Sequence, residues 1–367
     1  MEEGTTKEVV IAKLYSLEDE EDSNYTASNL IRRILSLFKN VRPGSDLTHF
    51  QLPPHFNIPR SQLQCYGEMV YSFGGQDLLG QCNGGDRQIE RLKSVVTWNI
   101  STLRPLIFGM APYNPVLGET HHVSHGNIHV LVEQVSHHPP VTASTVVPRF
   151  RGAYMEAEVK GKRTLKLLNR GETYEMNSPN LVMRFLPVTR AYWAGKVRIK
   201  CLENDLEAEL HLATDSLMGI RGNDRSIKGK IYDSSSGKKL YEIYGHWDTT
   251  VMAKDLKNGK LEVMYNATEN LTGLKTPIVK DLKEVGERES TAVWSQVSKA
   301  IMEQDWEKAR AAKTALEEIE RESRREKEAS GKTWVPRHFS VVRHGKDWSC
   351  SPLHPTISHA PITVPHL

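Results

Sequence analysis

The sequence predicts a mainly β protein that also contains α-helices, built around a large antiparallel sheet that forms a nearly closed β-barrel. From about Glu119 to Tyr265, short runs of alternating apolar and polar residues are separated by turn sequences, and residues 206–212 are a clear example. Residues 234–237 and 257–260 are typical of hairpins, and the Asn-Gly pair in the second indicates a two-residue loop. A sheet of this size closes to avoid free edges, and a wide barrel leaves an interior for a ligand.

Changes in composition and in the pattern of apolar residues divide the chain into five parts. They are an acidic flexible tail (1–22), a lid and connector (23–60), a helical segment that leads into the barrel (61–118), the barrel core (119–285), and a C-terminal helical segment and tail (286–367). Within the last part, residues 291–330 are highly charged and predict a helix or helix pair, with a break near Asp305.

Composition excludes several classes of protein. The 367 residues include 48 Lys+Arg and 45 Asp+Glu, a formal net charge of +3, whereas a general nucleic-acid binder carries a basic excess. No stretch approaches the roughly 18 apolar residues that a membrane-spanning helix needs. The start has no signal-peptide pattern, and the four scattered cysteines are typical of free thiols in a reducing compartment. We therefore expect a cytoplasmic protein whose membrane contact is peripheral and reversible.

An amphipathic helix is predicted before Pro43-Gly44. Leu30, Ile34 and Phe38 fall on one face at helical spacing, and charged residues occupy the other face. Spacing alone favours an ordinary helix packed on a core. The alternative is a lid that closes over a ligand, or that touches a membrane when open.

Two adjacent histidines, His137 and His138, end a strand-like run and are followed at once by two prolines. Either a structural role or a ligand role fits such a pair, and both imidazoles can donate to an anion. More histidines lie upstream, but Gly126-Asn127 between His125 and His129 indicates a turn, so zinc-helix geometry fails. We expect no metal site.

Lys313, Glu317 and Arg321 follow one another at steps of four, which puts them on one stripe of the predicted C-terminal helix. The adjacent apolar stripe consists of Ala309, Ala312, Leu316 and Ile319. The simplest interpretation is a ladder of surface ion pairs worth about 0.3–0.5 kcal/mol each. A polar rim at the mouth of a cavity is the alternative.

The octapeptide at residues 133–140, Glu-Gln-Val-Ser-His-His-Pro-Pro, resembles the fingerprint of the oxysterol-binding protein related family of cytosolic lipid carriers. Residues 114–119 resemble the end of a second family segment, Lys-Pro-x-Asn-Pro-x-Leu-Gly-Glu. The resemblance runs from about Leu30 to Phe339 and is to short members that have only the lipid-binding domain.

That resemblance implies a barrel that encloses a lipid tunnel, with no enzymatic activity and no cofactor. The headgroup of phosphatidylinositol 4-phosphate would be bound by His137, His138, Lys313, Glu317, Arg321 and Asn114. A second lipid, a sterol or another, would occupy the same interior in turn. Its partners would otherwise be membrane surfaces and an unidentified membrane-contact receptor, with contacts between endoplasmic reticulum and Golgi as a fitting place, and no nucleic acid.

The resemblance also favours the lid over the packed helix. Lid and connector contacts would come from Leu30, Ile34, Phe38, Leu47, Leu52 and Phe56. The chain departs from the family at Ala111, where a lysine is usual before Pro112. A charged hydrogen bond is worth about 1.5–3 kcal/mol, so phosphoinositide binding would weaken about tenfold or more unless Lys39, Arg42 or another cation substitutes.

Two rival functions remain open from the sequence. A lipid sensor or membrane-contact adaptor would bind without transporting, and a lipid hydrolase would use His137 or His138 as a base. None of the common nucleophile or phosphate-loop motifs is present, which makes the hydrolase the weaker rival. The sequence identifies neither the second lipid nor the donor and acceptor membranes.

Overall fold

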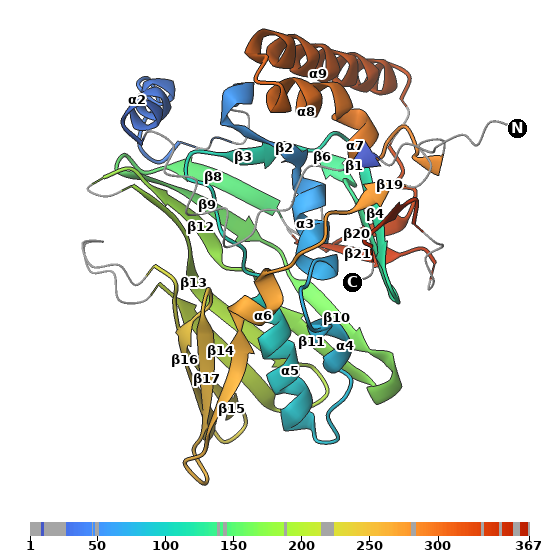
Figure 1. Ribbon diagram of the computed structural model, residues 1–367. Coiled ribbons are helices and arrows are strands. Elements are labelled where there is room, and N and C mark those ends of the chain that lie inside the picture. Colours follow the sequence, from blue (N-terminus) through green and yellow to red (C-terminus); the bar gives the residue numbers. More distant parts are fainter. Residues whose placement is uncertain are drawn as a thin grey trace, which may run out of the picture.

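The computed structural model describes residues 9–10, 27–45, 47, 51–137, 140–141, 145–186, 189–213, 224–279, 284–331, 334–344, 347–354 and 360–365. The predicted mainly β fold with helices is confirmed (Figure 1). Figure 1 shows α2, α8 and α9 at one end of the molecule and strands β14–β17 toward the other.

An 11-stranded antiparallel sheet forms the body. Its strands are β8 (Thr145–Phe150), β9 (Tyr154–Lys160), β10 (Arg163–Leu167), β11 (Glu172–Met176), β12 (Asn180–Arg184), β13 (Arg190–Cys201), β14 (Leu206–Leu212), β15 (Ser226–Asp233), β16 (Lys239–His246), β17 (Thr250–Asp255) and β18 (Leu261–Asn266). The order is β18-β17-β16-β15-β14-β13-β12-β9-β8, and β10 and β11 branch from β13. Within the described residues no ladder joins β18 to β8. The sheet is therefore a curved, partly open barrel and is not strictly closed.

Strand β13 changes partners along its length, which separates the sheet into two regions. Residues up to Ala194 pair with β12, whereas pairing with β14 begins at Gly195 and pairing with β11 at Ile199. Gly195 has φ +105°, a conformation that glycine adopts at no steric cost. Strands β8, β9 and β12 line one space, while β14 and β18 pack on a helix.

A second, five-stranded sheet has the order β1-β19-β22-β4-β5. Its strands are β1 (Val9–Val10), β19 (Ile278–Val279), β22 (Ile362–Thr363), β4 (Thr120–His125) and β5 (Ile128–Glu133). The turn between His125 and His129 forms as predicted. Three short pairs complete the β structure: β2 (Asn57–Ser61) with β3 (Ala111–Tyr113), β6 (Ser136–His137) with β7 (Pro140–Val141), and β20 (Phe339–His344) with β21 (Asp347–Pro352).

The helices are α2 (Ala27–Leu37), η1 (Pro54–Phe56), α3 (Gln62–Tyr71), α4 (Leu78–Gln81), α5 (Gln88–Ser101), η2 (Leu168–Arg170), α6 (Ala267–Leu271), α7 (Ser290–Val293), α8 (Ser295–Met302) and α9 (Trp306–Ala329). The predicted break near Asp305 is confirmed, because this side chain caps α9 by accepting from the Lys308 N–H. No helix that the structure describes is long and apolar enough to cross a membrane.

One predicted turn is wrong in detail. The hairpin between β17 and β18 forms, but the Asp255 N–H donates to the Lys260 carbonyl at 2.9 Å, so its loop comprises the four residues 256–259. A two-residue type I′ turn needs positive φ at both central residues. Of these four described residues, Gly259 alone has positive φ, at +74°.

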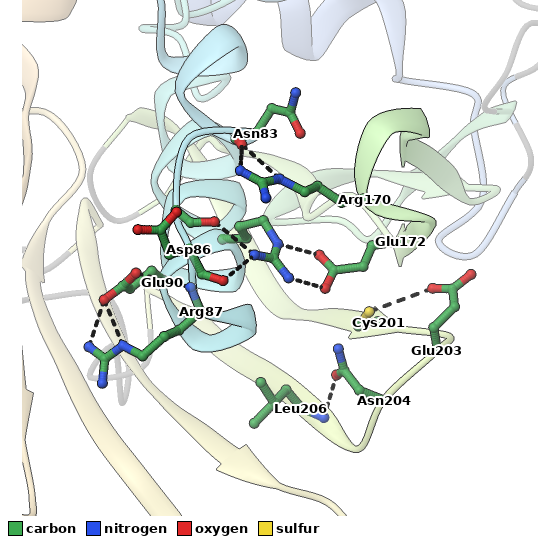
Figure 2. A network of polar contacts seen from close by, with 12 residues as sticks. Asn83, Asp86, Arg87, Glu90, Arg170, Glu172, Cys201, Glu203, Asn204 and Leu206 are labelled. Atoms are coloured by element: carbon green, nitrogen blue, oxygen red, sulfur yellow. Dashed lines mark hydrogen bonds and ion pairs between the residues drawn. The ribbon is translucent and has the colours of Figure 1, made fainter.

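The main core lies between α5 and the concave side of the large sheet. Leu92, Val95, Val96 and Ile100 recur at helical spacing on α5 and are all fully buried, and each is worth about 1.5–3 kcal/mol. Beside them Arg91 donates two hydrogen bonds to the buried Glu172 carboxylate, at 2.8 and 2.6 Å. Figure 2 labels Glu172 and draws these two bonds as dashed lines. This ion pair fastens α5 to β11.

Candidate functional site

A cavity of about 1380 Å³ lies between strands β8, β9 and β12 of the large sheet, helix α3, the connector and helix α9. Its β-strand walls come from alternate residues: Met155, Ala157 and Val159 on β9, and Leu181 and Met183 on β12. Side chains two apart on a strand share a face, so the period-two pattern produces an apolar wall. The cavity exceeds the roughly 300–1,000 Å³ of ordinary small-molecule sites, so it suits a large apolar ligand.

The polar stripe of α9 lines the mouth of this cavity. Lys313, Glu317 and Arg321 all belong to its lining, as the cavity-rim interpretation predicts. An Arg321 nitrogen lies 3.7 Å from a Glu317 carboxylate oxygen, and a second contacts Glu318. Glu317 also accepts a hydrogen bond from the Gln51 amide of the connector at 3.2 Å. The stripe therefore carries both an ion-pair ladder and a cavity-facing edge.

Lys313 is the most enclosed cation of the stripe. Its ammonium donates to the Leu52 carbonyl at 2.5 Å and to the Asn57 side-chain oxygen at 2.9 Å. Burial lowers the pKa of Lys313, and the nearby Glu317 carboxylate partly opposes this shift. The desolvated ammonium is accordingly a stronger electrostatic partner for an anion than a solvated surface lysine.

The apolar stripe next to it is only partly as predicted. Ala309 is fully buried, and Ala312 and Leu316 pack against the cluster formed with Trp294. Ile319, however, is 62% exposed, so its assignment to the packed stripe is wrong. Helical spacing gave the face correctly, but the packing that covers it does not reach this turn of α9.

The loop that carries Asn114 is held by a buried carboxylate. Asn114 is exposed and lines the cavity, as does Ala111. Glu119 has no exposed surface; it accepts from the Val116 N–H at 2.9 Å and from the Trp294 indole N–H at 2.9 Å, and burial raises its pKa. Glu119 thus stabilises the loop and does not face a ligand.

Gly118 in the same motif has both a conformational and a steric reason to be glycine. Its φ is +76°, and an added Cβ would lie 2.4 Å from the Trp334 ring. The Trp334 ring also stacks with the Lys327 ammonium, which lies 5.2 Å from the ring centroid. The C-terminal segment is therefore packed directly onto the Asn114 loop.

The predicted histidine pair is only partly visible. His138 lies outside the described residues, and of His137 the structure describes the backbone alone, paired with Pro140 in the β6–β7 turn. Gln134 and Val135, which precede the pair with Ser136 between, line the cavity. Whether both imidazoles reach the mouth stays a prediction.

The upstream histidines have structural surroundings. His121 is fully buried between the Tyr71 hydroxyl, 3.2 Å away, and the Glu289 carboxylate, 2.8 Å away. His125 contacts the Tyr71 carbonyl at 2.7 Å. In the part of the chain that the structure describes, no group of three or more His, Cys, Asp or Glu side chains could hold a metal ion.

Helix α2, the predicted lid, packs on the barrel. Ile34 is 3% and Phe38 6% exposed, and the Phe38 ring stacks on Phe150 with centroids 5.0 Å apart. Of the other predicted contacts, Leu47 and Phe56 are buried, Leu52 is half-buried, and the side chain of Leu30 lies outside the described residues. Phe38, Leu47 and Leu52 line the cavity, whereas Ile34 and Phe56 pack beside them without lining it.

Several polar residues that the sequence did not single out also line the cavity, among them Asn57, Arg324 and Lys327. The two cations continue the row of Lys313 and Arg321 along α9, and helical spacing could have found them. Asn57 could not be found this way, because its partner Lys313 lies 256 residues away. Lys39 and Arg42, suggested as substitutes for the missing lysine, are exposed and are not part of the cavity lining.

Known proteins agree with this architecture. The sequence profile of the family described as Oxysterol-binding protein matches residues 34–300. The chain belongs to the oxysterol-binding protein family. Among the family's curated members, oxysterol-binding protein-related protein 4B of Arabidopsis thaliana is 64% identical, over 99% of both chains. Oxysterol-binding protein-related protein 5 of mouse is 33% identical over 85% of this chain and 38% of its own length.

Solved structures of the family have the same fold. The Osh1 ORD domain in complex with ergosterol superposes with a TM-score of 0.72, at 23% identity, over 87% of this chain and 85% of that one. The Osh3 ORD in complex with PI(4)P, from Saccharomyces cerevisiae, gives a TM-score of 0.66 at 21% identity, over 86% of this chain and 88% of that one.

Proposed function

We propose that this protein is a cytosolic lipid-transfer protein that carries phosphatidylinositol 4-phosphate and a second lipid, a sterol, by turns between membranes. The observation that carries the proposal is one apolar cavity of about 1380 Å³ whose mouth is edged by Lys313, Glu317 and Arg321. Two related structures support the proposal: the Osh1 ORD domain was solved in complex with ergosterol, and the Osh3 ORD in complex with PI(4)P.

Tail and headgroup have separate roles in this proposal. Each buried CH₂ contributes about 0.8 kcal/mol, so the cavity supplies affinity for either lipid. Lys313 and Arg321 donate charge-assisted hydrogen bonds to phosphate oxygens, and Glu317 orients Arg321 or accepts from inositol hydroxyls. His137, His138 and Asn114 complete the headgroup site.

The alanine at position 111 leaves this headgroup site one cation short of the family pattern. Arg324 is the best substitute, since it lies one turn beyond Arg321 and lines the same cavity. Phosphoinositide binding then depends more on α9 than on the Asn114 loop.

The lid end of the molecule provides the membrane contact. Burial, and then the positive charges of Arg33 on α2 and Arg310 on α9, lower the pKa of His55. Both arginines therefore lie near this histidine. No carboxylate in the described part of the chain forms an ion pair with either arginine. Trp306 and Met302, 40% and 58% exposed, stand at the start of α9 and the end of α8. Basic and amphipathic side chains together fit an anionic membrane surface.

A lipid transfer assay tests the proposal. Wild-type protein is expected to extract phosphatidylinositol 4-phosphate and a fluorescent sterol from vesicles, and to move the sterol faster when the acceptor vesicles contain the phosphoinositide. The double variants Lys313→Ala/Arg321→Ala and His137→Ala/His138→Ala should lose phosphoinositide extraction and keep sterol extraction. Lys308→Ala, an exposed cation on the same helix, is the matched control.

Two outcomes would contradict the proposal. Binding to vesicles without transfer between them would favour a lipid sensor or membrane-contact adaptor. Turnover of a lipid substrate would favour a hydrolase. Native mass spectrometry of lipids that co-purify from cells identifies the second lipid.

A further inference from the structure

Three segments that are distant in sequence meet at the Asn57 side chain. Asn57 is 2% exposed and lies at the start of β2, at the end of the connector. Its amide nitrogen donates to the carbonyls of Ala111 and Pro112, at 3.1 and 3.4 Å. Its amide oxygen accepts from the Lys313 ammonium at 2.9 Å.

The orientation of this amide is fixed by its partners. Carbonyl oxygens only accept hydrogen bonds and an ammonium only donates them, so the nitrogen faces Ala111 and Pro112 and the oxygen faces Lys313. The main chain of Asn57 is also held, because Asn57 pairs with Ala111 in the β2–β3 ladder. The oxygen therefore has one allowed position.

Two of the three donors of the Lys313 ammonium are occupied, by Asn57 and by the Leu52 carbonyl. One donor remains for a ligand at the cavity that Lys313 lines. A lysine side chain is flexible and loses much rotamer freedom when it is fixed. The Leu52 carbonyl and the Asn57 amide oxygen are neutral acceptors that fix the Lys313 side chain before a ligand binds. They reduce the entropy that binding costs and leave the positive charge of the ammonium in place.

We infer that Asn57 is a positioning residue for phosphate recognition, which holds the Lys313 ammonium at the cavity mouth and thereby sets the preference for a phosphorylated inositol headgroup. The inference rests on the proposed function and adds to it a residue outside both sequence motifs. The backbone carbonyl of Ala111 takes part in this arrangement, because it helps to orient the amide that holds the Lys313 ammonium.

The same geometry links recognition to the connector. Leu52 and Asn57 both belong to the segment that joins the lid helix to the body, so Lys313 is held in place when this segment is seated. Displacement of the connector removes both acceptors at once.

The test compares three lipids: phosphatidylinositol 4-phosphate, phosphatidylinositol and a fluorescent sterol. Asn57→Ala removes the acceptor, and loss of a charged hydrogen bond is expected to lower extraction of the 4-phosphate about tenfold or more. Asn57→Asp keeps the shape but pairs with Lys313 and cancels its charge, so a loss at least as large is expected. Sterol and phosphatidylinositol extraction should stay within about twofold for both variants, since neither needs the phosphate contact.

A double-mutant cycle makes the test specific. In a Lys313→Ala background, Asn57→Ala should cause no further loss, because the residue acts through the lysine. Asn180→Ala is the matched control: this amide also bridges two groups, Glu156 and the Val159 N–H, and is not part of the cavity lining. It should leave the ratio of the two inositol lipids unchanged.

Three results would overturn the inference, and a fourth would defeat the proposed function on which it rests. An unchanged ratio of 4-phosphate to phosphatidylinositol in both Asn57 variants would overturn the inference. So would equal loss of all three lipids together with thermal stability, or additive losses in the cycle, each of which indicates a structural role only. If wild-type protein extracts no phosphatidylinositol 4-phosphate, the proposed function itself fails.

Discussion

Replacing Phe38 by alanine should loosen the lid by an amount that follows from its packing. The side chain is 6% exposed, and its ring stacks on Phe150 with centroids 5.0 Å apart and 14° between the planes. Burial of a phenylalanine is worth about 1.5–3 kcal/mol and an aromatic pair about 0.5–1.5 kcal/mol. The substitution should thus favour the open lid by about 2–4.5 kcal/mol, or about 30- to 1,600-fold in the equilibrium.

Two measurements check this prediction. Amide hydrogen exchange over Ala27–Leu37 should accelerate by a similar factor. Release of a bound fluorescent sterol into buffer should accelerate as well, because Phe38 lines the cavity. Ser36→Ala, near the end of α2, is the control, as its exposed hydroxyl bonds to the Arg33 carbonyl and to no other described residue. Phe38→Ala protein that exchanges and retains sterol like the control would refute the account of the lid.

The remaining predictions concern stability, membrane contact and charge. Arg91→Leu should destabilise the fold by about 3–5 kcal/mol, since it leaves Glu172 buried without its partner; an unchanged urea midpoint would contradict this. Hydrogen bonds from Arg91 lower the pKa of Glu172, so the pair's contribution is present at neutral pH and is lost as the pH falls below the ordinary carboxyl value of about 4.3. Trp306→Ala combined with Arg310→Glu should reduce flotation with anionic vesicles severalfold and leave neutral vesicles unaffected. Because burial lowers the pKa of Lys313, phosphoinositide extraction should decline before the pH reaches the ordinary lysine value of about 10.4, and Lys313→Arg should remove that decline.

Local patterns predicted the elements of the fold well. The alternation of apolar and polar residues predicted strands of the large sheet, and the break before α9 was predicted near Asp305, the residue that caps this helix. Both features depend on residues that are neighbours in sequence. The closure of the sheet could not be derived in this way. It depends on how far the strands curve and on where β13 changes partners, at Gly195, and alternation encodes neither.

The same distinction holds for the cavity. Helical spacing put Lys313 and Arg321 on one stripe, and the structure brings both to the lining. Helical spacing placed Ile319 on the correct face of α9 but did not predict that its side chain is exposed. Burial depends on which other elements of the fold cover that turn. Asn57 was missed because it has no motif; its role depends on contacts with Lys313 and with the Ala111 segment, which exist only in the folded chain.

The central claim is that a single cavity holds either of two lipids and never both. Protein loaded with one equivalent of a fluorescent sterol can be titrated with vesicles that contain phosphatidylinositol 4-phosphate, while bound sterol and bound phosphoinositide are both counted. The account predicts that one sterol leaves for each phosphoinositide taken up. Uptake of phosphoinositide by protein that keeps its sterol would contradict it.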